Sequence, residues 1–437
     1  MSGSRAAIRR KVPFIQARQG KERERRMGAD ADLIVLGGGP AGAVSAWLAA
    51  RDGLRVLLVD PARDRPRLEG LSPRLHRWLA GQGLIDGFAG IFGPFRRQVD
   101  WAGVSESNAE HVVERAALDA HLRRCAQAAG ARLTIGSGRP EPGGVWLGSD
   151  RLRTPMVIDA RGRRARASIG KAPATVALSG WVRANLPPGI RLVALPQGWL
   201  WRVALPDGRV WIQAVLDAAG DGSPAGRLQA AMAAADPALA HVPLSGQPLV
   251  REAAPRLPGP VGALDLLRVG DALAAMDPLS GHGQFWAVSS ALAVAAVRRT
   301  LAARPGAQSL CRRFLTQRAL QTSLHQARIG RDFLRAEPRF RAEPFWAARR
   351  DFPDDLPALP PPERPRIART ILVEDGLLAE REVLHTPAAP QGIGWFGSIP
   401  AAEAWRSWQQ GGAPALHARW GAAGAQIARQ LGPAGPS

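Results

Sequence analysis

Apolar runs and helical patterns alternate near the start of the chain. Residues 32–36 read Asp-Leu-Ile-Val-Leu, a run with β-branched residues that is typical of a buried parallel strand. A glycine-rich turn follows at once, and residues 43–50 then have an apolar helical pattern. Residues 54–59 form a second apolar run. Strand, helix and strand in this order predict a βαβ unit of an α/β fold with a Rossmann-like domain.

A different pattern occupies residues 175–249. Runs of alternating apolar and polar residues are separated there by Pro-Gln-Gly and Pro-Asp-Gly turns. Such runs predict antiparallel strands joined by tight turns. We therefore expect residues 176–254 to form an inserted antiparallel-sheet substrate domain. The nucleotide-binding domain would then be discontinuous, built from residues 29–175 and 255–330.

The pattern changes again after residue 330. Residues 354–366 are rich in proline and read as an extended connector. Apolar helical patterns follow near residues 401–409 and 413–431. We expect residues 331–437 to form a mostly helical C-terminal subdomain. It would cover the pocket, grip a partner or serve only as a packing appendage.

Composition narrows the class of protein. Hydrophobic residues make up 46% of the chain, as in a globular protein, and no apolar run reaches the roughly 18 residues of a membrane span. The two cysteines, Cys125 and Cys311, in a long chain without a signal peptide indicate a reducing compartment. We expect a cytoplasmic protein without a disulfide framework or a metal site.

Charge raises the question of partners. The formal net charge is +21, almost entirely from arginine. No nucleic-acid motif accompanies it, so the excess reflects either genome bias or a surface that docks an acidic protein. Residues 1–28 are the most basic stretch, and we expect a disordered basic tail there.

The first chemical motif is the glycine-rich turn. Residues 37–42 read Gly-Gly-Gly-Pro-Ala-Gly, which is GxGxxG between a predicted strand and a predicted helix. In this motif the first glycine permits the turn, the second lets a pyrophosphate approach, and the third allows close helix packing. Asp60, at the end of the next strand, is placed to bind a ribose diol. The predicted dinucleotide-binding residues are Gly37, Gly39, Ala41, Gly42 and Asp60.

Further motifs follow along the chain. Arg115 opens a predicted helix and is a candidate to reach a phosphate or ribose. Residues 266–269 form another short strand, and Gly270-Asp271 follows it. Residues 277–283, Asp-Pro-Leu-Ser-Gly-His-Gly, then lead into an apolar helix. Glycines at a helix start leave the backbone free to approach a ligand.

These motifs together resemble the FAD-dependent monooxygenases of the p-hydroxybenzoate hydroxylase fold. The resemblance is to the branch that holds tryptophan halogenases and geranylgeranyl reductases, and it covers about residues 30–330. Residues 277–283 resemble the Asp-Pro-Leu-Ser-Gly-x-Gly helix entry of that branch. Residues 68–73, Leu-Glu-Gly-Leu-Ser-Pro, resemble its Gly-Glu-Ser-x-Pro segment near the flavin, with Glu69 shifted in context. The resemblance implies FAD, with NAD(P)H as a transient electron donor.

The resemblance also implies roles for single residues. Asp271 would bind a ribityl or pyrophosphate-side oxygen of FAD, and Pro278 would lie near the reactive C4a edge of the flavin. Backbone N–H groups of Gly281, His282 and Gly283 would face the N1–C2=O end of the ring, where negative charge develops on reduction. His282 would contact the flavin or exchange protons, or would merely cap the helix. The catalytic candidates are Glu69, Pro278 and His282.

The residues weigh against two of the reactions known in this branch and its relatives. Halogenases use a lysine soon after the Glu-Ser segment, but no lysine occurs between Lys21 and Lys171. Trp199 and Trp201 retain the tryptophans of the halogenase Gly-Trp-x-Trp-x-Ile-Pro stretch, but the Ile-Pro register is lost, and core packing also explains both. The chain has no tyrosine, so a tyrosine-assisted phenol hydroxylation is excluded.

The remaining reading is hydroxylation of an indole. The chain is similar in overall shape to flavin monooxygenases that mature the tryptophylquinone cofactor of quinohemoprotein amine dehydrogenase. The resemblance implies an aromatic substrate, oxidised through a flavin C4a-hydroperoxide and carried as a tryptophan in an acidic protein or peptide. A halogenase, a prenyl-chain reductase and a non-catalytic FAD-containing docking protein remain the alternatives.

Overall fold

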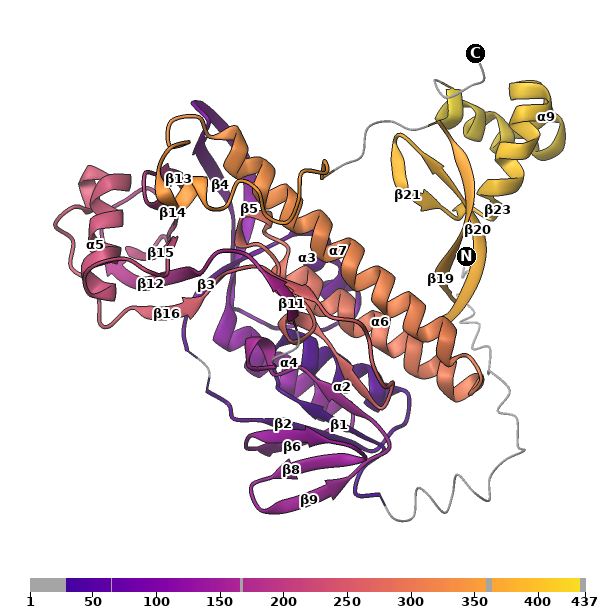
Figure 1. The fold of residues 1–437 in the computed structure, drawn as a ribbon, viewed down its shortest axis with the longest axis horizontal. Coiled ribbons are helices and arrows are strands. Elements are labelled where there is room, and N and C mark those ends of the chain that lie inside the picture. Colours follow the sequence, from indigo (N-terminus) through magenta and orange to yellow (C-terminus); the bar gives the residue numbers. More distant parts are fainter. Residues whose placement is uncertain (1–28, 64, 166–167, 359–363, 433–437) are drawn as a thin grey trace, which may run out of the picture.

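A computed structural model describes residues 29–63, 65–165, 168–358 and 364–432, and Figure 1 traces them through the fold. The basic tail predicted for residues 1–28 lies outside the described residues. The two largest sheets, a pair of long central helices and a projecting C-terminal unit dominate the described part.

The predicted nucleotide-binding domain contains a parallel sheet. Its strand order within the described residues is β18-β10-β1-β2-β6, and every neighbouring pair is parallel. Side chains of β1 are buried on both faces, one against helices and the other against a small meander of β7, β8 and β9. Burial on both faces explains the continuous apolar runs of the sequence. The bounds are β1 (Leu33–Leu36), β2 (Val56–Asp60), β6 (Arg132–Ile135), β7 (Gly138–Glu141), β8 (Gly144–Leu147), β9 (Asp150–Arg153), β10 (Val157–Asp159) and β18 (Leu266–Arg268).

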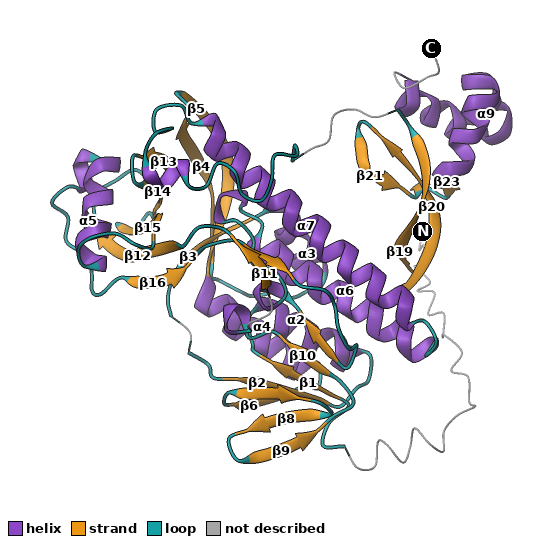
Figure 2. Cartoon of the chain, viewed as in Figure 1, coloured by secondary structure: helices purple, strands orange, loops and turns teal. Residues whose placement is uncertain are grey.

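Helices cover one face of this sheet. Figure 2 shows α2 (Pro40–Arg51) and α4 (Arg115–Ala128) close to it, and α6 (Gly283–Ala303) beside them. Among the described helices, only α6 is long and apolar enough to cross a membrane, and 67% of its most apolar window is buried inside the protein. This helix is therefore part of the core, where its alanines and valines pack against α2.

A larger, mainly antiparallel sheet forms the second wall of the molecule. In the described chain its order is β16-β12-β15-β14-β13-β4-β5-β3. Four strands lie between residues 175 and 217, where the alternating runs of the sequence predict antiparallel strands. The helix α5 (Pro224–Ala235) and the short η2 (Pro237–Leu239) cover one face. The strands are β3 (Leu68–Leu71), β4 (Ile91–Trp101), β5 (Val104–Glu114), β12 (Thr175–Arg183), β13 (Gly189–Leu195), β14 (Gly198–Ala204), β15 (Arg209–Asp217) and β16 (Leu249–Glu252).

The sheet is larger than the inserted domain predicted from the sequence. Strands β3, β4 and β5 come from the segment assigned to the nucleotide-binding domain, and they join the sheet where β13 pairs in parallel with β4. This pairing joins Ile190 to Arg97, far apart in the sequence, so local alternation does not reveal it. A two-stranded ribbon of β11 (Ser168–Lys171) and β17 (Arg256–Pro258) lies where the chain enters and leaves the sheet domain.

The central body also extends beyond the predicted boundary at residue 330. The helix α7 (Gln308–Ala336) runs beside α6 and continues past this point, and the chain then turns into the short α8 (Pro344–Ala347). Trp346 of α8 is fully buried and donates a hydrogen bond from Nε1 to the carbonyl oxygen of Leu195, at 2.9 Å. Residues up to about 352 therefore belong to the wall of the sheet domain. A further helix, α3 (Pro73–Gly81), packs near α6.

The C-terminal unit is mixed in structure instead of mostly helical. It contains a three-stranded antiparallel sheet of β19 (Arg366–Glu374), β20 (Leu377–Thr386) and β21 (Ala389–Ile393) among its described residues. The helix α9 (Ala401–Leu431) is broken at Gly411, Gly412 and Gly421, and β22 (Trp395–Phe396) pairs with β23 (Ile399–Pro400).

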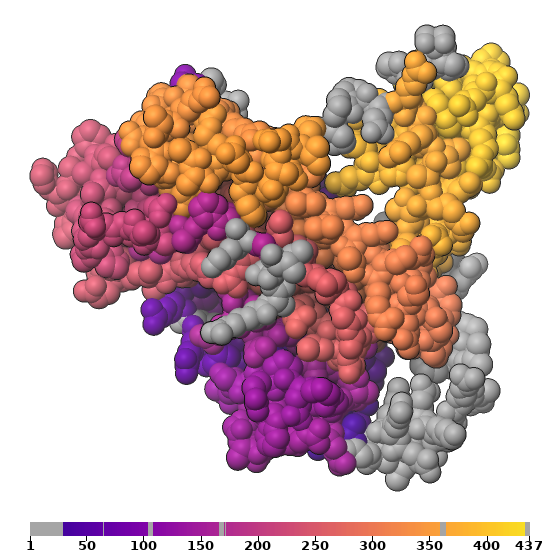
Figure 3. All heavy atoms as spheres, viewed as in Figure 1, coloured from indigo at the N-terminus to yellow at the C-terminus, as the bar shows by residue number. Residues whose placement is uncertain are grey.

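The attachment of this unit is local. The backbone N–H of Leu378 in β20 donates to Thr300 Oγ1 of α6, at 2.8 Å, and Leu378 is buried in the main core. The rest of the unit projects away from the body in the space-filling view (Figure 3).

Candidate functional site

A cavity of about 970 Å³ lies between the two sheets. The parallel strands contribute residues at their carboxyl ends, which is where open α/β sheets bind ligands. The antiparallel sheet contributes side chains from β12, β13, β14 and β15, and the first residues of α2 and α6 reach the same space. The cavity thus joins most of the motifs that the sequence singles out.

The glycine-rich turn has the geometry that its sequence predicts. Gly37 has a φ of +101°, and a Cβ there would overlap the carbonyl oxygen of Ala160 in the neighbouring strand loop. Gly39 and Ala41 line the cavity, whereas Gly42 packs against the carbonyl of Gly37 and does not. No side chain caps α2 at Gly39, so N–H groups of its first turn remain for an anion.

Asp60 braces this turn. Its carboxylate accepts hydrogen bonds from the backbone N–H of Gly38, at 2.5 Å, and from that of Ala62, at 2.7 Å. It also lines the cavity, as the predicted ribose contact requires. The side chain therefore fixes the glycine turn in addition to facing the ligand space.

Arg115 stands at the centre of a charged group that we call the arginine cluster, composed of Arg67, Glu69, Arg115, Asp119 and Arg251. Arg115 donates from Nη1 to Glu69, at 2.6 Å, and from Nε to Asp119, at 2.8 Å. Its Nη2 lies 3.7 Å from the position that a Cβ on Gly39 would take. One nitrogen of Arg115 is thus directed to the turn where a pyrophosphate would bind.

Glu69 is held as a carboxylate by this cluster. Burial alone would raise its pKa, but the charges of Arg115, Arg67 and Arg251 outweigh burial and lower the pKa well below its usual range. For Arg251, burial and the neighbouring arginines lower the pKa to about 10. An ionised Glu69 orients Arg115 and is poorly suited to donate a proton near neutral pH.

The second helix start is more open. Gly281 has a φ of +64°, and a Cβ on Gly281 or Gly283 would meet open space in the cavity. Pro278, in η4 (Pro278–Ser280), and Asp271, in η3 (Gly270–Ala272), also line the cavity. No side chain caps α6 at His282, so backbone N–H groups of its first turn remain for a ligand.

Two details at α6 differ from the prediction. The N–H of Gly281 donates to the carbonyl of Pro278, at 3.2 Å, and is therefore used within the η4 turn. The side chain of His282 is exposed, does not line the cavity, and places Nδ1 beside the carbonyl oxygen of Ser280. The neighbours Gly281 and Gly283 line the cavity, whereas the imidazole of His282 does not.

Sequence reasoning missed several residues of the cavity wall. Gln284 is buried in the first turn of α6, where its Nε2 donates to the carbonyl of Gly70 and its Oε1 has no partner among the described residues. A polar residue in this apolar helix was the available signal. Arg251 on the edge strand β16 gave no such signal. Trp199 and Trp201, for which the sequence left a halogenase motif or core packing open, form an apolar part of the wall with Leu192 and are themselves buried.

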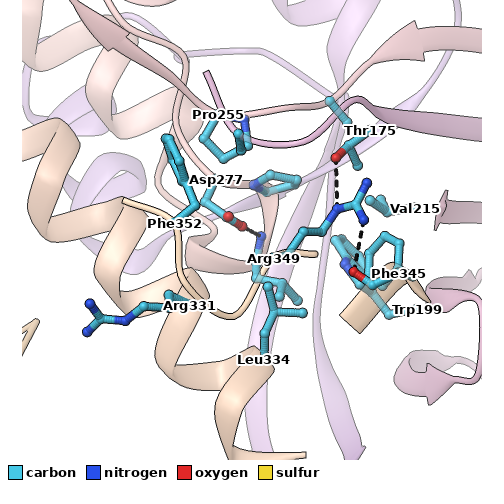
Figure 4. Close-up of a pocket in the computed structure, with 14 residues that line it drawn as sticks. Thr175, Trp199, Val215, Pro255, Asp277, Arg331, Leu334, Phe345, Arg349 and Phe352 are labelled. Carbon is cyan, nitrogen blue, oxygen red and sulfur yellow. Dashed lines mark hydrogen bonds between the residues drawn. The ribbon is translucent and has the colours of Figure 1, made fainter. Parts of the chain in front are cut away.

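A second, small cavity of about 20 Å³ adjoins the large one and shares Trp199, Asp277 and Pro278 with it. Figure 4 shows Asp277 and the guanidinium of Arg349 within this pocket, with Phe345 and Val215 around them. Arg349 is buried and donates to Thr175 Oγ1, at 3.1 Å. This volume holds about one water molecule.

The residues present fit FAD. The residues that line the large cavity extend from the glycine turn and Asp60 to the uncapped start of α6. Two uncapped helix N-termini face it, and both favour negatively charged groups such as a pyrophosphate or a reduced flavin ring.

Comparisons with known proteins agree with this geometry. Residues 35–73 match the model of the NAD(P)-binding Rossmann-like domain. The menaquinone reductase of Mycobacterium tuberculosis (strain H37Rv) is 39% identical over 124 residues, which are 24% of this chain and 29% of the relative. The match thus spans under a third of the curated relative.

Two solved structures are similar over nearly the whole chain. The peptidyl tryptophan dihydroxylase QhpG, essential for tryptophylquinone cofactor biogenesis, is 33% identical, with a TM-score of 0.79, over 94% of this chain and 100% of that one. The flavin-dependent halogenase CmlS is 16% identical, with a TM-score of 0.73, over 93% of this chain and 95% of that one. The second likeness concerns the fold alone, and it confirms the predicted α/β fold class.

Proposed function

Because this chain belongs to the family of the peptidyl tryptophan dihydroxylase QhpG, we propose that it is an FAD-dependent monooxygenase that hydroxylates a tryptophan ring held in a protein substrate. The enzyme class and the cofactor follow from the family: the chain is an FAD-dependent oxidoreductase. The observation that carries the proposal is the 33% identity to QhpG over 94% of this chain and the whole of the other.

The residues of the cavity divide the work of binding the cofactor. Gly37, Gly39 and the uncapped start of α2 would hold the pyrophosphate, with Arg115 beside them. Asp60 would bind the adenosine ribose, and Asp271 a ribityl oxygen. FAD, when bound and reduced by NAD(P)H, supplies the activation of dioxygen that an aromatic hydroxylation needs. Each hydroxylation would use one NAD(P)H and one dioxygen, with one oxygen atom entering the ring and the other leaving as water.

The wall of the antiparallel sheet would receive the substrate. Trp199, Trp201 and Leu192 provide an apolar surface opposite the start of α6, and a ring of indole size stacks well on tryptophan. Exclusion of water by this wall protects a reactive oxygen species from wasteful side reactions. The N–H groups at the start of α6 would stabilise negative charge on the nearby ring.

A protein substrate accounts for features outside the cavity. The formal net charge of +21 favours an acidic partner, because complementary charge speeds and orients docking. The projecting C-terminal unit offers further surface for such a partner. We infer a cytoplasmic reaction, before any export of the substrate protein.

Other reactions of the fold receive less support. None of the residues that line the large cavity is a lysine, and a halogenase requires one near the flavin. A reductase of a prenyl chain is compatible with the menaquinone reductase match, which covers only a quarter of this chain. A docking protein that merely contains FAD would need none of the apolar wall.

The test is incorporation of oxygen into tryptophan. The purified holoprotein would be incubated with NADH or NADPH, heavy-isotope dioxygen and synthetic peptides with one tryptophan in acidic, neutral or basic surroundings. We expect mass spectrometry to locate heavy oxygen on the indole, with acidic peptides modified fastest. A Gly39→Val variant is the flavin-free control, since its side chain would occupy the pyrophosphate position, and it should be colourless and inactive.

Two outcomes would contradict the proposal. Oxidation of NAD(P)H coupled to reduction of a menaquinone, without oxygen in any peptide, would identify a reductase. If neither NADH nor NADPH reduced the flavin with peptide present, the result would favour the docking protein.

A further inference from the structure

Asp277 differs from every other acidic residue that lines the large cavity. Each of the other five has an arginine nitrogen within 4.0 Å of its carboxylate. Asp277 has no such ion pair among the described residues. The five paired residues are Asp60, Glu69, Glu110, Glu252 and Asp271.

The carboxyl group of Asp277 is held in place from two sides. Its Oδ1 accepts a hydrogen bond from the backbone N–H of Leu279, at 2.8 Å, which leaves Oδ2 available. On the other side lies Gly330 of α7, where a Cβ would overlap this carboxyl group. Only glycine at position 330 leaves room for it. The group therefore has a fixed position at the junction of the two cavities.

None of the charged residues around Asp277 forms an ion pair with it among the described residues. Burial raises its pKa to about 6, although the N–H of Leu279 and the more distant charges of Arg349 and Arg163 act in the opposite direction. Arg163 faces Asp271, and Arg349 bonds Thr175 and Asp217. Arg331 of α7 also lines the small cavity, but Figure 4 shows its guanidinium directed away from Asp277. The group can thus change protonation state close to neutral pH.

We propose that Asp277 is the acid–base residue of this site, an inference that rests on the proposed function. When a ring carbon of the substrate has gained the hydroxyl group, it must lose its hydrogen to restore aromaticity. The Asp277 carboxylate would take this hydrogen as a proton, and the electron pair of the broken C–H bond would return to the ring. The oxidant is the dioxygen of the proposed function.

The small cavity provides the exit for the proton. It has room for about one water molecule, and Asp277, Thr175 and Arg349 line it. A water there would receive the proton from Asp277 and return the carboxylate for the next cycle. The buried Arg349 favours the ionised form without pairing with it.

The experiment compares the wild type with Asp277→Asn, which keeps the shape of the side chain. We expect flavin content and anaerobic flavin reduction by NADH within about twofold of wild type, and hydroxylated peptide lowered by about 100-fold. In the wild type, product formation should rise with pH through about 6, and the variant should lose this rise. The matched control is Asp236→Asn, because Asp236 pairs with Arg202 and lines neither cavity.

A second variant covers the case in which Asp277→Asn fails to bind flavin. Gly330→Ala keeps the carboxyl group but forces it to move, and it should lower product and shift the pH rise while flavin is retained. If Asp277→Asn kept more than about half of the product and an unchanged pH profile, Asp277 would not be the base, and the proposed function would stand. If the wild type incorporated no oxygen into the peptide, both the proposed function and the role of Asp277 would be contradicted.

Discussion

Glu69 and Asp277 line the same cavity, yet their surroundings shift the pKa values of their carboxyl groups in opposite directions. Glu69 lies within 3 Å of both Arg67 and Arg115, and its pKa is lowered. Asp277 has no ion pair in the described chain, and burial raises its pKa to about 6. Burial disfavours the charged form of both carboxyl groups, so the difference between their pKa values comes from the neighbouring arginines. One part of the cavity is thus built for fixed charge and the other for a changing one.

The largest effect should come from removing the centre of the arginine cluster. Arg115→Ala leaves Glu69 and Asp119 buried without their closest cation, and we expect the free energy of unfolding to fall by about 3 kcal/mol. Arg115→Lys, which keeps the charge but not the two-sided hydrogen bonding, should lose about half as much. Urea unfolding at neutral pH measures both. A loss below about 1 kcal/mol for Arg115→Ala would show that the cluster is not a unit.

The pH dependence of stability sharpens the comparison. The lowered pKa of Glu69 means that its contribution is present above its unfolded value and is lost as the pH falls through the folded one. The raised pKa of Asp277 has the opposite sign: its contribution is present at low pH and is lost as the pH rises through about 6.

Two variants measure these signs. Between about pH 5 and about pH 8, Asp277→Asn should gain about 1 kcal/mol of stability relative to the wild type, because the wild type must ionise a buried carboxyl. Glu69→Gln should be less stable than the wild type at both pH values, with a difference that changes little. Denaturant unfolding of the flavin-saturated proteins at the two pH values measures both differences in the free energy of unfolding. Parallel profiles for both variants would mean that Asp277 is ionised throughout.

The sequence predicted those parts of the site that depend on neighbours in the chain. The glycine turn at 37–42 and the helix start at 281–283 are recognisable because turn, strand and helix follow one another directly. The role proposed for Asp277 was not predicted, since the position of its carboxyl group depends on Gly330, on a distant helix. A similar reason explains why the segment of strands β3 to β5 was assigned to the nucleotide-binding domain: β4 joins the larger sheet by pairing with β13, which is distant in the sequence.

The smallest expected effect concerns His282, which the sequence offered as a catalytic candidate. Its imidazole is exposed, and His282 is not among the residues that line the cavity. We expect His282→Ala to change product formation by less than about twofold and stability by less than about 0.5 kcal/mol. The assay is the same oxygen incorporation that tests Asp277→Asn, which gives the scale for loss of an acid–base group. A decrease of more than about tenfold would place the imidazole beside the flavin in the holoprotein. The site would then hold two titrating groups, and the contrast between Glu69 and Asp277 would not suffice to explain its pH dependence.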